Sequence, residues 1–210
     1  MENPARRSPG PLVFWSLVAL VFLWSGHRPF DRITWVLEVA PAVLGAGILW
    51  ATRRRFPFTP TVLFLIGLHM VILMIGGHYT YARVPLFDGI RDVFGLARNH
   101  YDRLGHFAQG FVPALIAREI LIRRSPLKPG AWLFFLVCCV ALSLSAVYEL
   151  VEWRVSVATG SAGDAFLGTQ GDPWDTQWDM ALALMGAVTS QIALGRRLFF
   201  DPGFSANGAV

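Results

Sequence analysis

Carboxylates and histidines recur in pairs at helical spacing along this 210-residue chain, each pair at one end of an apolar segment. Three pairs stand three or four residues apart: Asp102 with His106, Glu149 with Glu152, and Asp175 with Asp179. Residues at this spacing share one face of an α-helix. Helices that each present two such side chains build the carboxylate-bridged metal sites of helical bundles. The mixture of imidazole and carboxylate ligands favours Zn²⁺, Mn²⁺ or Fe²⁺, so the pattern predicts a divalent metal centre.

The predicted metal ligands are His78, His106, Glu149, Glu152, Asp175 and Asp179. Glu149, Glu152 and Asp102 are predicted to be the catalytic carboxylates, one of which would act as a general base. A bound metal would activate water or polarise a phosphoryl or carbonyl oxygen. The predicted set omits His69, which lies nine residues before His78 and therefore faces roughly the opposite way on its helix.

Helix capping is a competing interpretation for the aspartates. The stretch from Asp172 resembles a helix start, with Asp172 at the N-cap, Pro173 at the first helical position and Asp175 at the third. Asn99 and Asp102 are also three residues apart, which would make Asn99 an N-cap and Asp102 the third helical residue. Acidic residues also favour helix N-termini because of the helix dipole. The sequence therefore leaves both the cap and the metal site open for Asp102 and Asp175.

Capping does not explain Glu149 and Glu152, which lie near the C-terminal end of an apolar segment. The helix dipole disfavours anions there, so a metal, a proton or ion pairs with Arg103 and Arg154 must neutralise them. A single histidine in a membrane helix is commonly just hydrogen-bonded to a neighbouring helix. For His106, the aspartate four residues earlier would orient the ring as a second-shell partner.

The composition requires a membrane around these residues. The chain is 54% hydrophobic and only 15% charged, with a mean hydropathy of +0.49, which is too apolar for an ordinary soluble domain. The net charge of +4 comes from arginines in short clusters between apolar runs, a membrane pattern and not a nucleic-acid-binding one. Cys138 and Cys139 are adjacent within an apolar run and are interpreted as small apolar fillers.

The hydropathy pattern predicts an all-α polytopic bundle of about six transmembrane helices in a single domain, residues 1–210. The predicted spans are 11–26, 33–51, 59–78, 104–122, 131–153 and 177–198. The first follows Arg6 and Arg7 but lacks a small-x-small cleavage site, so we expect an uncleaved helix. Several apolar cores fall short of the ~20 residues that cross a bilayer. Their helices are therefore expected to continue through polar residues that face protein or water.

Basic clusters predict the orientation. They occur at Arg6–Arg7, at Arg53–Arg55, at Arg123, Arg124 and Lys128, and at Arg196–Arg197. Six spans bring all of them to one side, which the positive-inside rule makes cytoplasmic, with both termini. On the opposite side, residues 79–103 have the pattern of an interfacial helix, and the glycine-rich stretch 154–176 is expected to fold back over the outer mouth.

Three stretches carry a resemblance to a known family: Tyr-Asp-Arg-Leu-Gly-His-Phe at 101–107, Tyr-Glu-Leu-Val-Glu-Trp at 148–153, and Gly-Thr-Gln-Gly-Asp-Pro-Trp-Asp-Thr-Gln-Trp-Asp-Met at 168–180. Together they resemble the YjdF-like family of bacterial inner-membrane proteins. The resemblance implies a helical fold in the bacterial inner membrane and leaves the activity open. A shorter element, Asp102-Arg103 followed by His106-Phe107, is similar to VanZ-like membrane proteins. Ala183 stands where that family has an asparagine, so glycopeptide resistance is not implied.

Two functions remain open at this level. The first is a metal-dependent enzyme acting at the extracytoplasmic face on a lipid or lipid-linked substrate, with the bilayer as its surroundings. The second is a non-enzymatic transporter, proton-coupled protein or envelope-component binder, because intramembrane carboxylates and histidines also serve proton coupling. A cluster that only holds helices together, with partner binding as the role, is a third interpretation.

Overall fold

The computed structural model describes residues 10–159, 169–201 and 204, and every regular element among them is helical. The elements are α1 (Gly10–Ser25), α2 (Arg32–Thr52), α3 (Pro60–Tyr79), α4 (Pro85–Phe94), α5 (Tyr101–Arg124), α6 (Ala131–Thr159), α8 (Asp175–Leu194) and the 3₁₀-helix η2 (Arg197–Phe200). The predicted all-α fold class is therefore confirmed. Each predicted span coincides with one helix, and α6 continues six residues past the predicted end at residue 153.

Three of the helices, α2, α3 and α6, are long and apolar enough to cross a membrane. Helix α1 is apolar but has only 16 residues. Helix α5 has the length, yet it carries charged side chains within its span, among them Arg118 and Glu119. Both side chains are buried against the protein, so they do not meet lipid. Burial of this kind is how ionisable residues are accommodated within membrane helices.

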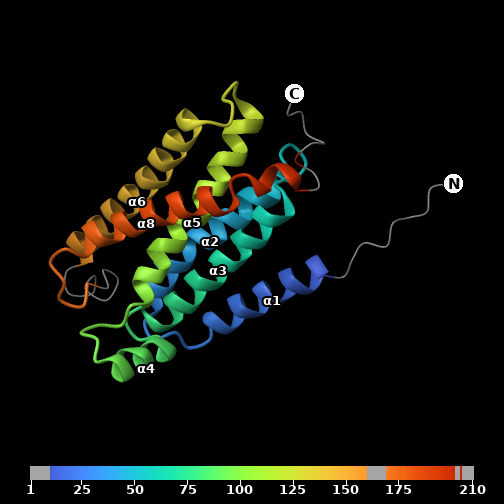
Figure 1. Cartoon of the computed structure of the whole chain (residues 1–210). Coiled ribbons are helices and arrows are strands. Elements are labelled where there is room, and N and C mark those ends of the chain that lie inside the picture. Colours follow the sequence, from blue (N-terminus) through green and yellow to red (C-terminus); the bar gives the residue numbers. More distant parts are fainter. Residues whose placement is uncertain (1–9, 160–168, 202–203, 205–210) are drawn as a thin grey trace.

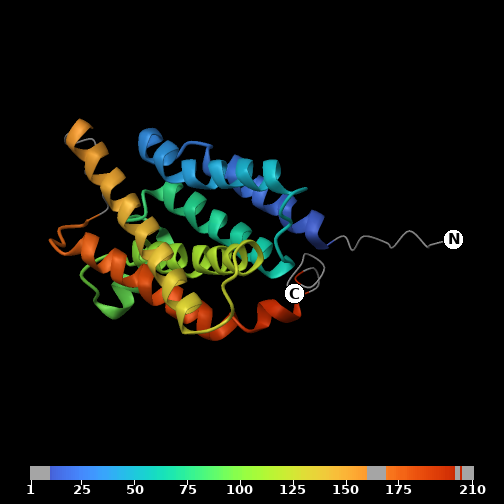
Figure 2. The same ribbon diagram turned by 90° about the horizontal axis from the view of Figure 1, so that it is seen from above.

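The helices form two packed groups (Figures 1 and 2). In the first, α3 packs on α1 and α2; in the second, α5, α6 and α8 pack on one another, and α3 also packs on α5. Helix α6 lies at the opposite edge of the molecule from α1 in Figure 1. One side-chain bond crosses from α2 to α6: the Tyr148 hydroxyl donates to Glu38 Oε2 at 3.0 Å.

Two glycines allow α5 and α8 to approach closely. A Cβ atom added at Gly110 would collide with the backbone carbonyl of Ala183, and one added at Gly186 would collide with the carbonyl of Phe107. Small residues at such crossings are typical of membrane helix packing, where close backbone contact replaces the hydrophobic effect. This crossing sets the distance between the first turns of α5 and α8, which carry the pairs Asp102–His106 and Asp175–Asp179.

The helix starts differ from the capping interpretation. Helix α8 has Trp174 at its N-cap, and Asp172 lies before it, where Oδ1 accepts a bond from the Trp174 amide at 3.0 Å. The predicted N-cap role of Asp172 is therefore wrong, because its side chain closes a turn ahead of the helix. His100 is the N-cap of α5, one residue later than expected. Asn99 Oδ1 still accepts from the Tyr101 amide at 3.0 Å.

The segment expected to form an interfacial helix contains α4, whose N-cap region begins at Val84. Leu86, Val93 and Phe94 on this helix are exposed, whereas Phe87 packs edge-on against Tyr101 of α5. An amphipathic helix with an exposed apolar face is typical of a segment lying in a membrane interface. The helical part of that prediction is confirmed.

Basic clusters that are distant in sequence meet at the other end of the molecule. Arg124 donates to the carbonyl of Arg55 and Arg123 to the carbonyl of Pro57, each at 2.7 Å. Arg118 donates to the carbonyl of Gly195 at 3.2 Å. The loop before α3, the end of α5 and the end of α8 thus lie together, as the six-span arrangement requires. The cluster at residues 6–7, like the stretch 160–168, lies outside the described residues.

Candidate metal centre

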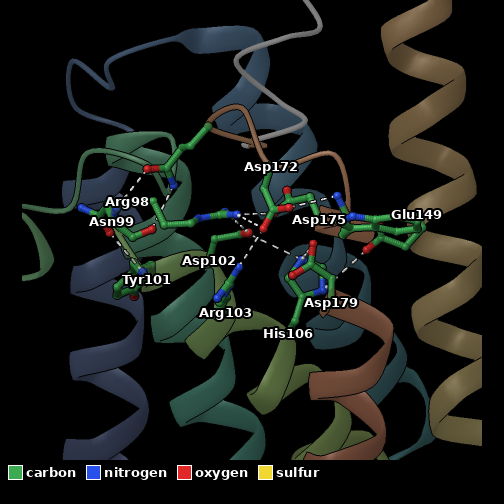
Figure 3. Close-up of polar contacts among 12 residues, drawn as sticks. Arg98, Asn99, Tyr101, Asp102, Arg103, His106, Glu149, Asp172, Asp175 and Asp179 are labelled. Carbon is green, nitrogen blue, oxygen red and sulfur yellow. Dashed lines mark hydrogen bonds and ion pairs between the residues drawn. The ribbon is translucent and has the colours of Figure 1, made fainter. Parts of the chain in front are cut away.

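The ring of His106 lies among carboxylates from three helices, and it is almost fully buried (Figure 3). Its Nε2 atom is 3.5 Å from Oδ1 of Asp102 and 3.8 Å from Oδ2 of Asp179. One ligand atom from each of these three residues lies within 4.8 Å of the others. Separations of this size between imidazole nitrogen and carboxylate oxygens suit a metal ion bound at about 2 Å from each ligand.

The other ring nitrogen faces a different carboxylate. His106 Nδ1 is 3.7 Å from Oε1 of Glu149, which reaches it from α6. A carboxylate on this side favours the tautomer with the proton on Nδ1, which leaves the Nε2 lone pair directed at Asp102 and Asp179. The two ring nitrogens therefore face different groups: Nε2 faces Asp102 and Asp179, and Nδ1 faces Glu149.

Three polar atoms of this cluster are buried without a hydrogen-bond partner among the described residues: His106 Nδ1, Glu149 Oε1 and Asp179 Oδ1. Unsatisfied buried polar atoms are costly and rare in folded proteins, and they are commonly explained by a bound ion or water. Two of these atoms, His106 Nδ1 and Glu149 Oε1, lie 3.7 Å apart and face each other, so the unsatisfied groups are concentrated around a single imidazole.

Above this cluster, Arg98 joins three aspartates (Figure 3). It contacts Asp175, and it lies 3.3 Å from Asp102 Oδ2 and 3.7 Å from Asp172 Oδ2. Arg103 also binds Asp172, at 2.9 Å. Arg98 thus holds one oxygen of Asp102, while the other oxygen, Oδ1, faces His106. This arrangement fixes the Asp102 carboxylate so that a metal would meet an oriented ligand.

Residues 10–199 match the protein family described as "Predicted membrane protein (DUF2238)". The chain belongs to this DUF2238 family. A relative in Escherichia coli strain K12, "Inner membrane protein YjdF", is 51% identical over 179 residues, which covers 85% of this chain and 86% of the relative. No solved structure matches the chain. The family resemblance expected from the three sequence stretches is confirmed, and the chain is a membrane protein.

In this DUF2238 protein, the structure brings some predicted site residues together and separates others. Asp102, His106, Glu149 and Asp179 converge, whereas Asp175 is engaged by Arg98. Glu152 has no hydrogen bond or ion pair to the His106 ring and lines a cavity that His106 also lines. The alternative pairing of the two glutamates with arginines is not found among the described residues. Arg103 binds Asp172, and Arg154 lies over the Trp153 ring.

In this DUF2238 protein, His78 lies outside the candidate metal centre. Its Nδ1 atom is 2.9 Å from the carbonyl oxygen of Ser25, and its ring stacks on Trp24 with centroids 4.4 Å apart. This histidine therefore connects the end of α3 to the end of α1. The sequence predicts that His78 lies at the same membrane depth as the other ligands. Depth alone does not determine which face of α3 meets α5.

Sequence reasoning missed three residues of this DUF2238 site. Arg98 stands four residues before Asp102, a spacing that indicates a helical ion pair, although α5 begins only at Tyr101. Glu38 is a carboxylate within an apolar span, which is a functional signal by itself. His69 lines the same cavity as Glu38 and His106. The nine-residue separation predicts that His69 and His78 face opposite sides of α3, but it does not tell which side faces α5.

Proposed function

We propose that this protein is a metal-dependent membrane enzyme, with a Zn²⁺, Mn²⁺ or Fe²⁺ ion bound by Asp102, His106 and Asp179. Its proposed substrate is a lipid or lipid-linked molecule at the extracytoplasmic face of the bacterial inner membrane. The observation that carries the proposal is the convergence of these three buried ligand atoms within 4.8 Å of one another. The position of Glu149, 3.7 Å from Nδ1 of His106, supports it, because a proton on Nδ1 leaves the Nε2 lone pair directed at Asp102 and Asp179.

The proposed topology has six crossings, formed by α1, α2, α3, α5, α6 and α8, with both termini in the cytoplasm. The meeting of Arg124 with Arg55 and of Arg118 with Gly195 at one end supports it, because basic loops stay cytoplasmic. The His106 centre lies at the opposite end, near the start of α5. Exposed tryptophans, Trp153 and Trp178, flank that end as an interfacial aromatic belt would.

A groove between α6 and α8 supports a lipid-like substrate. It has a volume of about 470 Å³ and combines the apolar side chains of Leu150, Trp153 and Met180 with the carboxylate of Glu149. Glu149 also faces His106, so one side chain links the groove to the metal centre. The lining also contains Asp172, Asp175 and Thr176, so an apolar wall faces a polar one, as an amphipathic lipid would require.

The chemistry assigned to each residue follows from its position. A metal at His106 Nε2 would supply Lewis-acid activation of a bound oxygen. Glu149 is the proposed general base, because it contacts both the groove and the ring. Arg98 holds Asp102 in place through the second carboxylate oxygen. Glu152, predicted as a ligand and a catalytic group, is instead proposed to serve the cavity considered below.

Elemental analysis of the detergent-purified protein tests the proposal. The parent is expected to carry nearly one equivalent of metal after reconstitution with Zn²⁺, Mn²⁺ or Fe²⁺. An Asp179→Asn variant and a His106→Ala, Glu149→Gln double variant should lose it while they keep their helical circular dichroism. Asp92→Asn is the matched control, because Asp92 is an exposed carboxylate on α4. Absence of metal from the reconstituted parent would overturn the enzyme proposal and favour proton-coupled transport.

A further inference from the structure

A second polar cavity lies between the two helix groups, on the far side of Asp102 and His106 from the α6–α8 groove. Its volume is about 60 Å³, and α2, α3, α5 and α6 all contribute to its lining. One water needs about 10–15 Å³ measured in this way, so the cavity accommodates a few water molecules or an ion with part of its hydration shell. The polar lining residues include Glu38, His69, Gln109, Tyr148 and Glu152.

Three carboxylates line the cavity, those of Glu38, Asp102 and Glu152, and no arginine or lysine is among its lining residues in the described chain. Glu38 and Glu152 have exposed fractions of 5% and 6%, so both are removed from bulk solvent. Glu38 accepts one hydrogen bond, from the Tyr148 hydroxyl at 3.0 Å. Glu152 has neither an ion pair nor a hydrogen bond with any described residue. A buried carboxylate without a partner is strongly unfavourable in its charged form, so each such group must take up a proton or face a cation.

A histidine on the opposite wall has the same deficiency. The Nε2 atom of His69 is buried and lacks a hydrogen-bond partner among the described residues. His69 comes from α3 and Glu152 from α6, so the two unsatisfied groups approach the cavity from different helices, and Glu38 reaches it from α2. Packing defects on one helix do not produce such a convergence, but a shared ligand does.

From this geometry we infer a second cation site, in which a partly hydrated divalent ion of the Mg²⁺ type is held by Glu38 and Glu152. Mg²⁺ keeps several of its waters and binds proteins through one or two carboxylates, which matches two carboxylates around a cavity with room for water. The two negative charges balance the ion. A bound water would donate to His69 Nε2 and so satisfy the remaining buried atom.

The two cation sites differ in ligand spacing. Among the described residues, only Asp102, His106 and Asp179 bring three ligand atoms within 4.8 Å of one another. That compact set suits direct coordination by nitrogen and oxygen, as Zn²⁺ prefers. The wider Glu38–Glu152 cavity suits an ion that keeps water between itself and part of the wall. Asp102 and His106 line this cavity as well, so the two sites share a wall.

Mn²⁺ is the probe for this inference, because it accepts the same carboxylate and water ligands as Mg²⁺ and is paramagnetic. Binding is measured on the purified full-length protein from the loss of the free-Mn²⁺ electron paramagnetic resonance signal, after one equivalent of Zn²⁺. The parent should bind one Mn²⁺, and Mg²⁺ should compete for it. Glu152→Gln should weaken binding about tenfold or more, equivalent to about 1.4 kcal/mol. Glu38→Gln is the second variant in case the first does not fold.

Asp179→Asn separates this inference from the metal-enzyme proposal, although both concern neighbouring sites. The second site is established if Mn²⁺ binding weakens in Glu152→Gln but persists in Asp179→Asn and in the Asp92→Asn control. This conclusion does not depend on Zn²⁺ binding. A different result would overturn the second site alone. In that case Asp179→Asn loses Zn²⁺, but the parent and both glutamate variants bind Mn²⁺ with equal affinity. A parent that binds no Mn²⁺ also overturns it.

Discussion

At the residue scale, the two nitrogens of His106 face different partners, and this asymmetry leads to a graded expectation for the carboxylates. Asp179 would be a direct ligand, so Asp179→Asn should abolish binding. Glu149 would act through Nδ1, and loss of such an orienting carboxylate typically lowers metal affinity about 10–100-fold. We therefore expect Glu149→Gln to bind Zn²⁺ more weakly than the parent but measurably, in a titration against a chromophoric chelator. Equal affinities of Glu149→Gln and the parent would remove the orienting role.

His100 provides a pH-dependent prediction at the same scale, outside the spanning segments. Burial lowers the pKa of His100, and the positive charges of Arg103 and Arg98 lower it further. The unfolded chain then takes up the proton more readily than the folded chain, so stability should fall as the pH drops below about 6.5. Thermal unfolding in detergent between about pH 5 and pH 8 measures this. His100→Gln should flatten the low-pH part of the curve; an unchanged slope would contradict the assignment.

The residue scale also shows where sequence reasoning succeeded and where it stopped. Spacing alone identified Asp102, His106 and Asp179, because residues four apart on a helix share a face and their helices had to meet. It did not show which of the two histidines, His69 or His78, faces the inside of the bundle. The two face opposite sides of α3, and only the packing of α3 on α5 decides which side is internal. Arg98 was missed for a similar reason, since its three aspartate partners come from two distant segments.

At the scale of elements, the crossing of α5 and α8 should be the most sensitive contact in the fold. Gly110→Ala places a methyl group against the Ala183 carbonyl, and overpacking of this kind typically costs about 1–3 kcal/mol. The thermal midpoint in detergent should fall accordingly, and metal affinity should fall with it because both helices carry ligands. Gly47→Ala is the matched control, since a Cβ there meets nothing within 4 Å. A Gly110→Ala midpoint equal to that of Gly47→Ala would contradict the close crossing.

At this scale the sequence predicts the positions of the long helices better than it predicts their ends. Apolar runs located all the long helices, because a hydrocarbon environment requires them. The ends were less predictable: Asp172 resembles an N-cap, yet its side chain closes a turn before α8. Helix α5 is less apolar than the other long helices, in part because Arg118 and Glu119 lie inside it. Only the tertiary contacts, such as Thr59 donating to Glu119 Oε2 at 2.9 Å, explain how the helix tolerates them.

At the scale of the whole molecule, two groups of helices enclose a polar region that contains several buried carboxyl groups. Within the outer half, Arg98 and Arg103 balance Asp172 and Asp175. No described arginine or lysine reaches Glu38, Glu149 or Glu152. A cation at each of the two sites would account for these buried carboxylates together.

This assignment depends on the outer end facing the periplasm, and labelling of single cysteines tests that orientation. With Cys138 and Cys139 replaced by alanine, Asp92→Cys places a thiol on exposed α4, and Arg54→Cys places one in the exposed loop between α2 and α3. A membrane-impermeant maleimide added to intact spheroplasts should modify the thiol at position 92 readily. The thiol at position 54 should react only after lysis, because basic loops remain cytoplasmic. The reverse pattern would place the His106 centre on the cytoplasmic side, and the substrate would then have to be sought in the inner leaflet.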